Sequence, residues 1–222
     1  MMKLKKLAPF ALVAATAWVG IFCLPALLRA QSVGVEAGNV IFTNATGRQA
    51  KLTATGRDSA PNLAPDGRRV VFVRATPGQL VATGSGEEEA IELWLIETNG
   101  KNATLLVRGA SHPQPENVLA GMQAPQFAPD GKRIFFLSAA WATSGAVHTV
   151  DPMTKKVAFV CAGNDLEVIR RGEYRGHLIV QQHRYFLGGG SYDWHWLLKP
   201  DGKEVGPIGE ETQMFKETYL HD

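Results

Sequence analysis

Residues 60–73, with the sequence APNLAPDGRRVVFV, decide the fold because they occur a second time as residues 124–137, APQFAPDGKRIFFL. Aligned without gaps, 8 of the 14 positions are identical, and the two copies are offset by 64 residues. A repeat of this quality is typical of proteins built from similar units that stack on one another.

Each copy predicts a β-hairpin. Pro-Asp-Gly, at 65–67 and again at 129–131, is turn chemistry: proline presets φ, the aspartate bonds its own backbone, and glycine takes the left-handed position. The apolar runs at 70–73 and 134–137 are rich in β-branched and aromatic residues, which favours strands buried on both faces. A short strand, a tight turn and a central strand therefore make the inner half of a four-stranded unit.

The pattern A-P-x-[LF]-A-P-D-G-[RK]-R followed by an apolar strand resembles the repeat of TolB-like β-propellers. The family's unit continues with an L-W strand, an N-G turn and a last strand, which residues 91–96, 99–100 and 103–107 match. Leu52-Thr53 matches the family's unit ending. The usual Trp-Ser before Pro-Asp-Gly is replaced here by Leu-Ala and Phe-Ala. The resemblance covers about residues 39–209 and is specific for fold rather than activity.

The expected fold is all-β and β-propeller-like, with about three full four-stranded blades and a partial N-terminal blade that lacks its inner half. The blades begin near residues 59, 122 and 166. Residues 210–222 either supply the missing inner strand and close a four-bladed ring, or the blades form an open arc. Residues 76–89 are predicted to be a mobile surface loop, and residues 109–121 a second long loop.

The chain divides into a signal peptide at 1–30, a polar leader at 31–38 and the propeller domain at 39–222. Three lysines precede a long apolar run, and small residues precede Gln31. The alternative is an uncleaved membrane anchor, which would be the chain's one membrane contact. Both place the domain outside the bacterial cytoplasm, in the periplasm or secreted. Cys161 then stands alone, so no disulfide framework supports the fold.

Composition argues against one class of function, and the motifs argue against another. The formal net charge is +2, with no basic stripe among aromatics, so nucleic acid is not expected as a partner. Propellers of prolyl-oligopeptidase type accompany a hydrolase domain with a G-x-S-x-G turn, which this sequence lacks. No cofactor is predicted.

The third blade carries the densest set of polar and aromatic candidates. A loop at 187–191 would pair His183 with His195, Tyr185 with Asp193, and Arg184 with Trp194. Strand alternation then separates two faces. The first face holds His177, Gln181, His183, Tyr185, Asp193 and His195, and the second holds Arg184 and Trp194 among apolar residues. The second face is expected to pack on blade two, with Arg184 over Trp194 as a cation–π pair.

The polar face has two interpretations. It is either a solvent-exposed face of an end blade, or a metal or ligand site in which His183, His195 and Asp193 would be the ligands. A faint resemblance to oligogalacturonate lyases, which are TolB-like propellers, implies a metal-dependent lyase that would use His177, His183 and His195. His148 is expected to be packed or hydrogen-bonded inside its strand.

The sequence therefore predicts a non-catalytic exported scaffold that binds a protein partner in the cell envelope, as the TolB-like resemblance implies. Its expected binding surface is the two long loops with the third-blade hairpin. Two alternatives stay open. The first is the lyase-like enzyme, and the second is an incomplete propeller that completes its ring as a homodimer.

Overall fold

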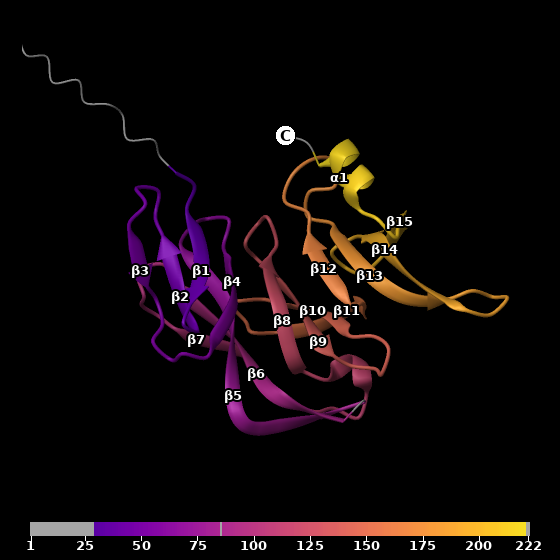
Figure 1. Ribbon diagram of the computed structural model, residues 1–222, viewed down its shortest axis with the longest axis horizontal. Coiled ribbons are helices and arrows are strands. Elements are labelled where there is room, and N and C mark those ends of the chain that lie inside the picture. Colours follow the sequence, from indigo (N-terminus) through magenta and orange to yellow (C-terminus); the bar gives the residue numbers. More distant parts are fainter. Residues whose placement is uncertain (1–28, 85, 221–222) are drawn as a thin grey trace, which may run out of the picture.

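The computed structural model describes residues 29–84 and 86–220, which form four antiparallel sheets with strands in chain order (Figure 1). The partial blade consists of β1 (Ser32–Glu36), β2 (Asn39–Thr43) and β3 (Gln49–Lys51). Blade one consists of β4 (Asp58–Leu63), β5 (Arg69–Thr83), β6 (Gly86–Glu97) and β7 (Thr104–Val107). Blade two consists of β8 (Ala120–Phe127), β9 (Ile134–Ala139), β10 (Ala146–Val150) and β11 (Val157–Ala162). Blade three consists of β12 (Asp165–Val168), β13 (Leu178–Tyr185), β14 (Ser191–Leu198) and β15 (Glu204–Gly209).

The repeat determines the local structure of blades one and two. Each Pro-Asp-Gly turn joins the first strand of its blade to the second, as the sequence predicts. Each first strand also carries a bulge, at which Ala60 and its repeat equivalent Ala124 adopt φ values of 47° and 49°. Since alanine rarely takes this conformation, its occurrence at the same place in both copies is a shared feature of the unit.

Successive blades bury the two faces of each central strand. In β5, Val70 and Phe72 pack on the partial blade, whereas Val71 and Val73 pack on blade two. The same alternation continues in β9, whose residues divide between blades one and three. A fully buried side chain of this size contributes roughly 1.5–3 kcal/mol, so these joints hold the arc together.

Two amide side chains reinforce the joints at the ends of the inner strands. Asn62 Oδ1 accepts a hydrogen bond from the backbone N–H of Phe127, 3.1 Å away, in the next blade. One repeat later, Gln126 Oε1 accepts from Val168 N–H at 3.0 Å, and Gln126 Nε2 donates to Leu166 O at 2.7 Å. Each inner strand thus ties the following one through the side chain at the same repeat position.

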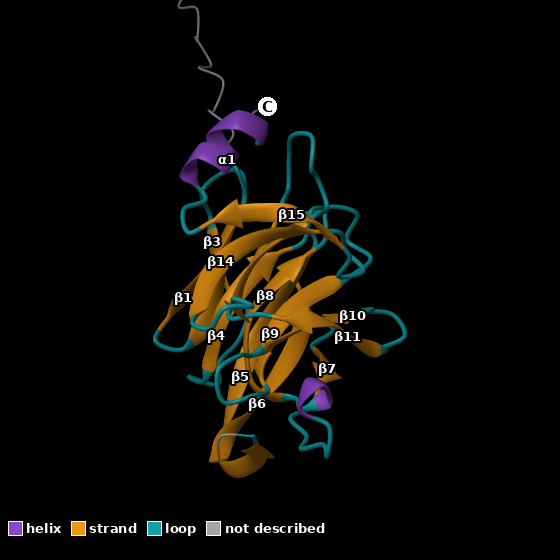
Figure 2. Ribbon diagram, turned by 90° about the vertical axis from the view of Figure 1, so that its right-hand side faces the viewer, coloured by secondary structure: helices purple, strands orange, loops and turns teal. Residues whose placement is uncertain are grey.

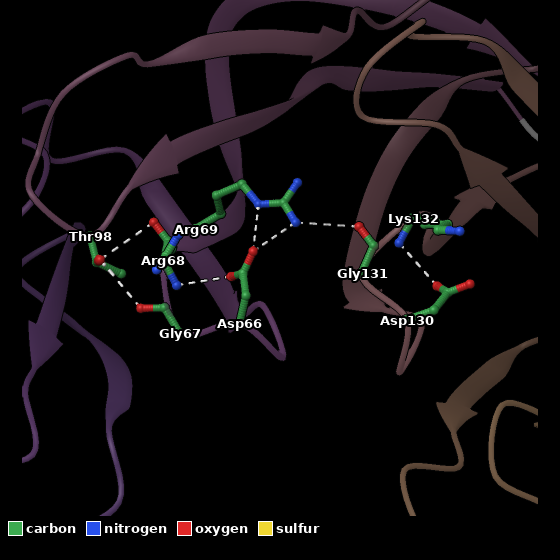
Figure 3. A network of polar contacts seen from close by, with 8 residues as sticks. All are labelled: Asp66, Gly67, Arg68, Arg69, Thr98, Asp130, Gly131 and Lys132. Carbon is green, nitrogen blue, oxygen red and sulfur yellow. Dashed lines mark hydrogen bonds and ion pairs between the residues drawn. The ribbon is translucent and has the colours of Figure 1, made fainter.

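The Pro-Asp-Gly turns add a further contact between blades (Figure 3). Asp66 accepts hydrogen bonds from the backbone N–H of Arg68 and from the guanidinium of Arg69. That guanidinium also reaches the carbonyl oxygen of Gly131, 3.4 Å away in the second turn. The turn residues therefore position an arginine that links two neighbouring repeats.

The arc is open, and a helix covers its C-terminal end. Of the two arrangements expected for residues 210–222, the closing strand is wrong, because α1 (Gln213–Tyr219) forms there, and the open arc is confirmed. Phe215 and Leu220 pack on Ile169, Ile179 and Leu197 of blade three. Apolar residues on that outer face need cover, and an amphipathic turn of helix supplies it without a further blade.

Two other expectations also need correction. The polar leader contains strand β1, which pairs along its length with β2. The loop expected at 76–89 is largely a β-ribbon, because β5 and β6 continue their pairing from Leu80–Glu89 to Thr83–Gly86. Residues 1–28 of the expected signal peptide lie outside the described residues. Within residues 29–84 and 86–220, none of the helices has the length and apolar character needed to cross a membrane.

We predict that Gln126→Ala lowers the free energy of unfolding by about 1–3 kcal/mol, because it leaves Val168 N–H and Leu166 O without their partner. Urea denaturation followed by tryptophan fluorescence measures this. Gln123→Ala, at an exposed position of the same strand, is the matched control and should change stability by less than about 0.5 kcal/mol. Equal effects of the two substitutions would contradict the proposed joint.

Candidate functional site

A cavity lies where the inner strands of the three full blades end. It has a volume of about 640 Å³. Its lining residues are Asn62, Gln126, Glu167, Val168, Ile169, Arg170, Arg171, Lys216, Glu217 and Leu220. Since it draws on β4, β8, the end of β12 and α1, we call it the axial cavity. Concave sites lined by a few convergent polar groups are the usual places where proteins bind ligands.

Arg170 is the most distinctive group of the axial cavity. It follows β12 in blade three, and its Nη2 donates a hydrogen bond to Asn62 Oδ1 of blade one at 3.0 Å. Partial loss of solvation lowers the pKa of this guanidinium, because it disfavours the charged form. A guanidinium has five N–H donors, and among the described residues the Arg170 side chain makes one hydrogen bond. The arrangement can bind a carboxylate or other planar oxygen anion.

The rest of the cavity is charged but largely neutralised. Glu167 of β12 forms an ion pair with Lys216 of α1. Glu167 precedes Val168 just as Gln126 precedes Phe127 and Asn62 precedes Leu63, so it occupies the repeat position of the two joining amides. No described blade follows blade three, and Glu167 instead forms its ion pair with α1.

Sequence reasoning missed the axial cavity. Asn62, Gln126 and Arg170 come from three different blades and become neighbours only through the curvature of the arc. One signal in the sequence pointed to the amides of this cavity. The residue after Ala-Pro carries an amide side chain in both copies of the repeat, as Asn62 and as Gln126.

The third-blade hairpin has the two faces that the sequence predicts, but its register differs. His183 lies opposite Asp193, and Gln181 lies opposite His195, so the expected His183–His195 and Tyr185–Asp193 pairs are wrong. Gly189 and Gly190 have φ values of 96° and 83°, and they close the loop one residue earlier than expected. Each residue of β13 therefore pairs with the residue two positions earlier in β14 than expected. A shift of two residues keeps every side chain on its predicted face.

On the outer face, the histidines turn to different partners. His183 Nδ1 lies 2.9 Å from Asp193 Oδ1, and its ring contacts the ring of Tyr185 edge-on at 5.0 Å. His195 Nδ1 lies 3.0 Å from the carbonyl oxygen of Glu210. His177 immediately precedes β13, and its ring contacts the ring of Tyr174 edge-on. Across the described ranges, no group of three or more His, Cys, Asp or Glu residues is placed to hold a metal ion.

The opposite face of the hairpin packs on blade two, as expected, through Trp196 and its apolar neighbours. Arg184 lies 3.6 Å from the ring centroid of Trp196, not over Trp194, because its side chain extends along the strand toward Gln182. It also pairs with Glu204. Trp194 instead contacts Tyr192, with ring centroids 4.8 Å apart. Arg184 and Trp194 therefore belong to a structural cluster separate from the histidines.

The expected binding loops lie at the end of the arc opposite α1 (Figure 2). The β5–β6 ribbon and the 3₁₀ helix η1 (Pro115–Asn117) both project there, away from the helix. The axial cavity, which α1 helps to line, is at the other end. The molecule thus presents two separate surfaces, and the loops do not contribute to the cavity.

Ser138 and His148 form a buried hydrogen-bonded pair that resembles a nucleophile and its base. Ser138 Oγ lies 3.2 Å from His148 Nδ1, and His148 Nε2 lies 2.9 Å from the carbonyl oxygen of Glu116. Both residues are nearly inaccessible, at 2% and 1% exposed. They therefore hold η1 against blade two, and His148 is packed and hydrogen-bonded as the sequence predicts.

Comparisons with known proteins agree with this architecture. No protein-family model matches the sequence, and no curated protein sequence matches it. Similar solved structures include a putative TolB from Agrobacterium tumefaciens, with 13% identity, a TM-score of 0.52, and coverage of 76% of this chain and 55% of that one. The β-propeller domain of the Trilobed protease from Pyrococcus furiosus, described as having an open velcro topology, gives 11% identity and a TM-score of 0.51 over 78% of this chain and 49% of that one.

An acylaminoacyl peptidase gives 12% identity and a TM-score of 0.50 over 79% of this chain and 29% of that one. The chain spans about half the length, or less, of the chains that it matches. Such likenesses show the fold alone. The protein has an open β-propeller fold, with three four-stranded blades and one three-stranded blade in the described residues.

We predict that the protein loses stability as the pH falls below about 6.5. Burial lowers the pKa of His148 below its usual 6.5, and the hydrogen bond to Glu116 opposes this only in part. The unfolded chain then binds the proton more readily, which costs about 1.4 kcal/mol for each unit of pKa depression. As the pH falls, the loss of unfolding free energy begins near the pKa of His148 in the unfolded chain, and it is complete below the pKa of His148 in the folded protein.

Urea denaturation at a series of pH values checks this prediction. His148→Gln should flatten the pH dependence, because the side chain no longer titrates. His112→Gln, at an exposed position, is the control and should retain the wild-type dependence. Identical pH profiles for wild type and His148→Gln would show that the buried histidine is not responsible.

Proposed function

We propose that this protein is a non-catalytic, TolB-like propeller scaffold, exported to the periplasm or secreted, that binds a segment of a protein partner in its axial cavity. The observation that carries the proposal is Arg170, an exposed guanidinium that reaches from blade three to Asn62 of blade one and lines the axial cavity. Its remaining donors, which have no partner among the described residues, suit a carboxylate of the bound segment. Joints between blades keep the cavity walls rigid, so little ordering is lost on binding.

Two features support a binding role over catalysis. The Ser138–His148 pair is sealed from solvent, and the outer-face histidines point to different partners. The TolB-like resemblance of the repeats and the structural likeness to a putative TolB support the same class and the same compartment. The axial cavity replaces the long loops as the first candidate surface, because it combines concavity with an available charged group.

We do not favour ring closure by a second copy. Completing the ring would require the outer face of blade three to pack on the partial blade of another molecule. That face is covered by α1 over its apolar half and carries His183, Asp193 and the exposed Tyr185 over the other half. Polar groups buried in such a joint would lose solvation without gaining partners.

We predict that a photo-crosslinking residue at Glu217, which lines the cavity, captures an envelope protein in cells, and that Arg170→Ala lowers the yield of this adduct about tenfold. The loss follows from removal of a charge-assisted hydrogen bond. The same crosslinker at Met214, which is 79% exposed on α1 but does not line the cavity, is the control. Immunoblotting and mass spectrometry measure the yield.

Circular dichroism and thermal melting show whether the Arg170→Ala protein is folded, since the substitution also removes the bond to Asn62. Arg170→Lys keeps the charge and should retain part of the adduct. An adduct that forms equally at Met214, or that survives Arg170→Ala, would disprove binding through the axial cavity.

For the lyase alternative, we predict that purified protein equilibrated with manganese retains less than one metal ion per chain, and that His183→Ala and His195→Ala leave this content unchanged. The reason is that His183 pairs with Asp193 while His195 turns to the Glu210 carbonyl, so their rings do not converge. Elemental analysis after gel filtration measures the content. Stoichiometric manganese that both substitutions remove would favour the enzyme.

A further inference from the structure

The partial blade lacks its innermost strand within the described residues. In blades one and two, the next strand along the chain after the last strand is the inner strand of the following blade: β8 follows β7, and β12 follows β11. By the same path β3 leads to β4, so β3 is a last strand and β1 occupies the second position. Among residues 29–84 and 86–220, no strand fills the inner position next to β1, and β1 pairs with β2 alone.

The flank of β4 shows what the missing strand would cover. Phe127 and Pro125 of β8 are buried against blade one, whereas their repeat equivalents on β4, Leu63 and Pro61, are partly exposed. Phe127 N–H also bonds to the side chain of Asn62 in the preceding inner strand. No described side chain bonds to the N–H of Leu63 in this way. The difference between two copies of one repeat therefore outlines an unfilled joint.

The edge of β1 has backbone groups that can pair with a further strand. Glu36 and Asn39 close a two-residue turn, so the alternation of antiparallel pairing directs the N–H and C=O groups of Val33 and Val35 to the free edge. Val35 is 46% exposed. The chain before β1 does not cover this edge at residue 29, whose N–H bonds to Ala45 O in the β2–β3 turn.

We propose that an extended segment of a partner polypeptide pairs antiparallel with β1 and takes the place of the missing inner strand. Strand addition of this kind uses main-chain hydrogen bonds for affinity and alternate side chains for specificity. The segment carries Asn or Gln opposite Leu63, as Asn62 and Gln126 do in the two observed joints, followed by an apolar residue. Inner strands run antiparallel to their second strands, which sets the direction.

A partner is favoured over a second copy because β4, β8 and β12 of each copy are already paired in their own sheets. The described residues of another molecule thus offer no spare inner strand. This inference rests on the proposed binding role, since the occupant is a partner segment. It concerns the β1 edge rather than Arg170, so either proposal can fail while the other stands.

The test uses the full chain and a fluorescent peptide of residues 118–128, VLAGMQAPQFA, which reproduces an inner strand with its joining glutamine. We expect binding at millimolar peptide or below, with amide hydrogen exchange slowed at Val33 and Val35. The peptide with Gln126→Ala should bind about fivefold more weakly, because it loses the hydrogen bond to Leu63.

On the protein, Val35→Pro should weaken binding at least about tenfold, since it removes one edge donor, while Val35→Thr keeps the donor and should bind as wild type. Proline is tolerated where the lost N–H faces solvent, and a thermal melt verifies folding. The altered peptide tests the joint on the unaltered protein if Val35→Pro does not fold.

Four results would overturn the proposal. They are no binding at millimolar peptide, protection confined to other segments, affinity unchanged by Val35→Pro, and β1 amides that are already protected without peptide. In the last case light scattering identifies the occupant: a dimer shows a second copy, and a monomer shows a segment of the same chain.

Discussion

The joint between successive blades is the interaction on which the whole structure depends. Each sheet is too thin to shield its own side chains, and its central strand carries apolar residues on both faces, as Val70 to Val73 do in β5. Burial is complete only when a second sheet lies on each side. The amides of Asn62 and Gln126 add hydrogen bonds from each inner strand to the next.

An open arc leaves two ends that must be completed, and the chain treats them differently. At the C-terminal end, α1 covers the apolar part of blade three. Glu167, at the repeat position of Asn62 and Gln126, forms an ion pair with Lys216 of α1. At the other end, no described strand pairs with the outer edge of β1, and β4 keeps a partly exposed flank. The two ends of the arc therefore differ: α1 packs on the outer face of blade three, and the described residues hold no such cover on β1 and β4.

The candidate sites were predicted unequally, for physical reasons. Alternation along β13 and β14 separated the histidine face from the tryptophan face, because side-chain direction depends only on strand parity. The register did not follow, since three consecutive glycines from Gly188 allow more than one closure of the loop. The axial cavity was missed because its walls come from residues more than a hundred positions apart, such as Asn62 and Arg170.

The sequence by itself determined the repeat, the Pro-Asp-Gly turns and the approximate bounds of three four-stranded blades, because these follow from local turn chemistry and from hydrophobic period. Only the tertiary structure decided that the arc stays open, that the last residues form a helix, and that Arg170 meets Asn62. These depend on how small rotations at each joint accumulate, and that sum is a property of packed side chains rather than of any one segment.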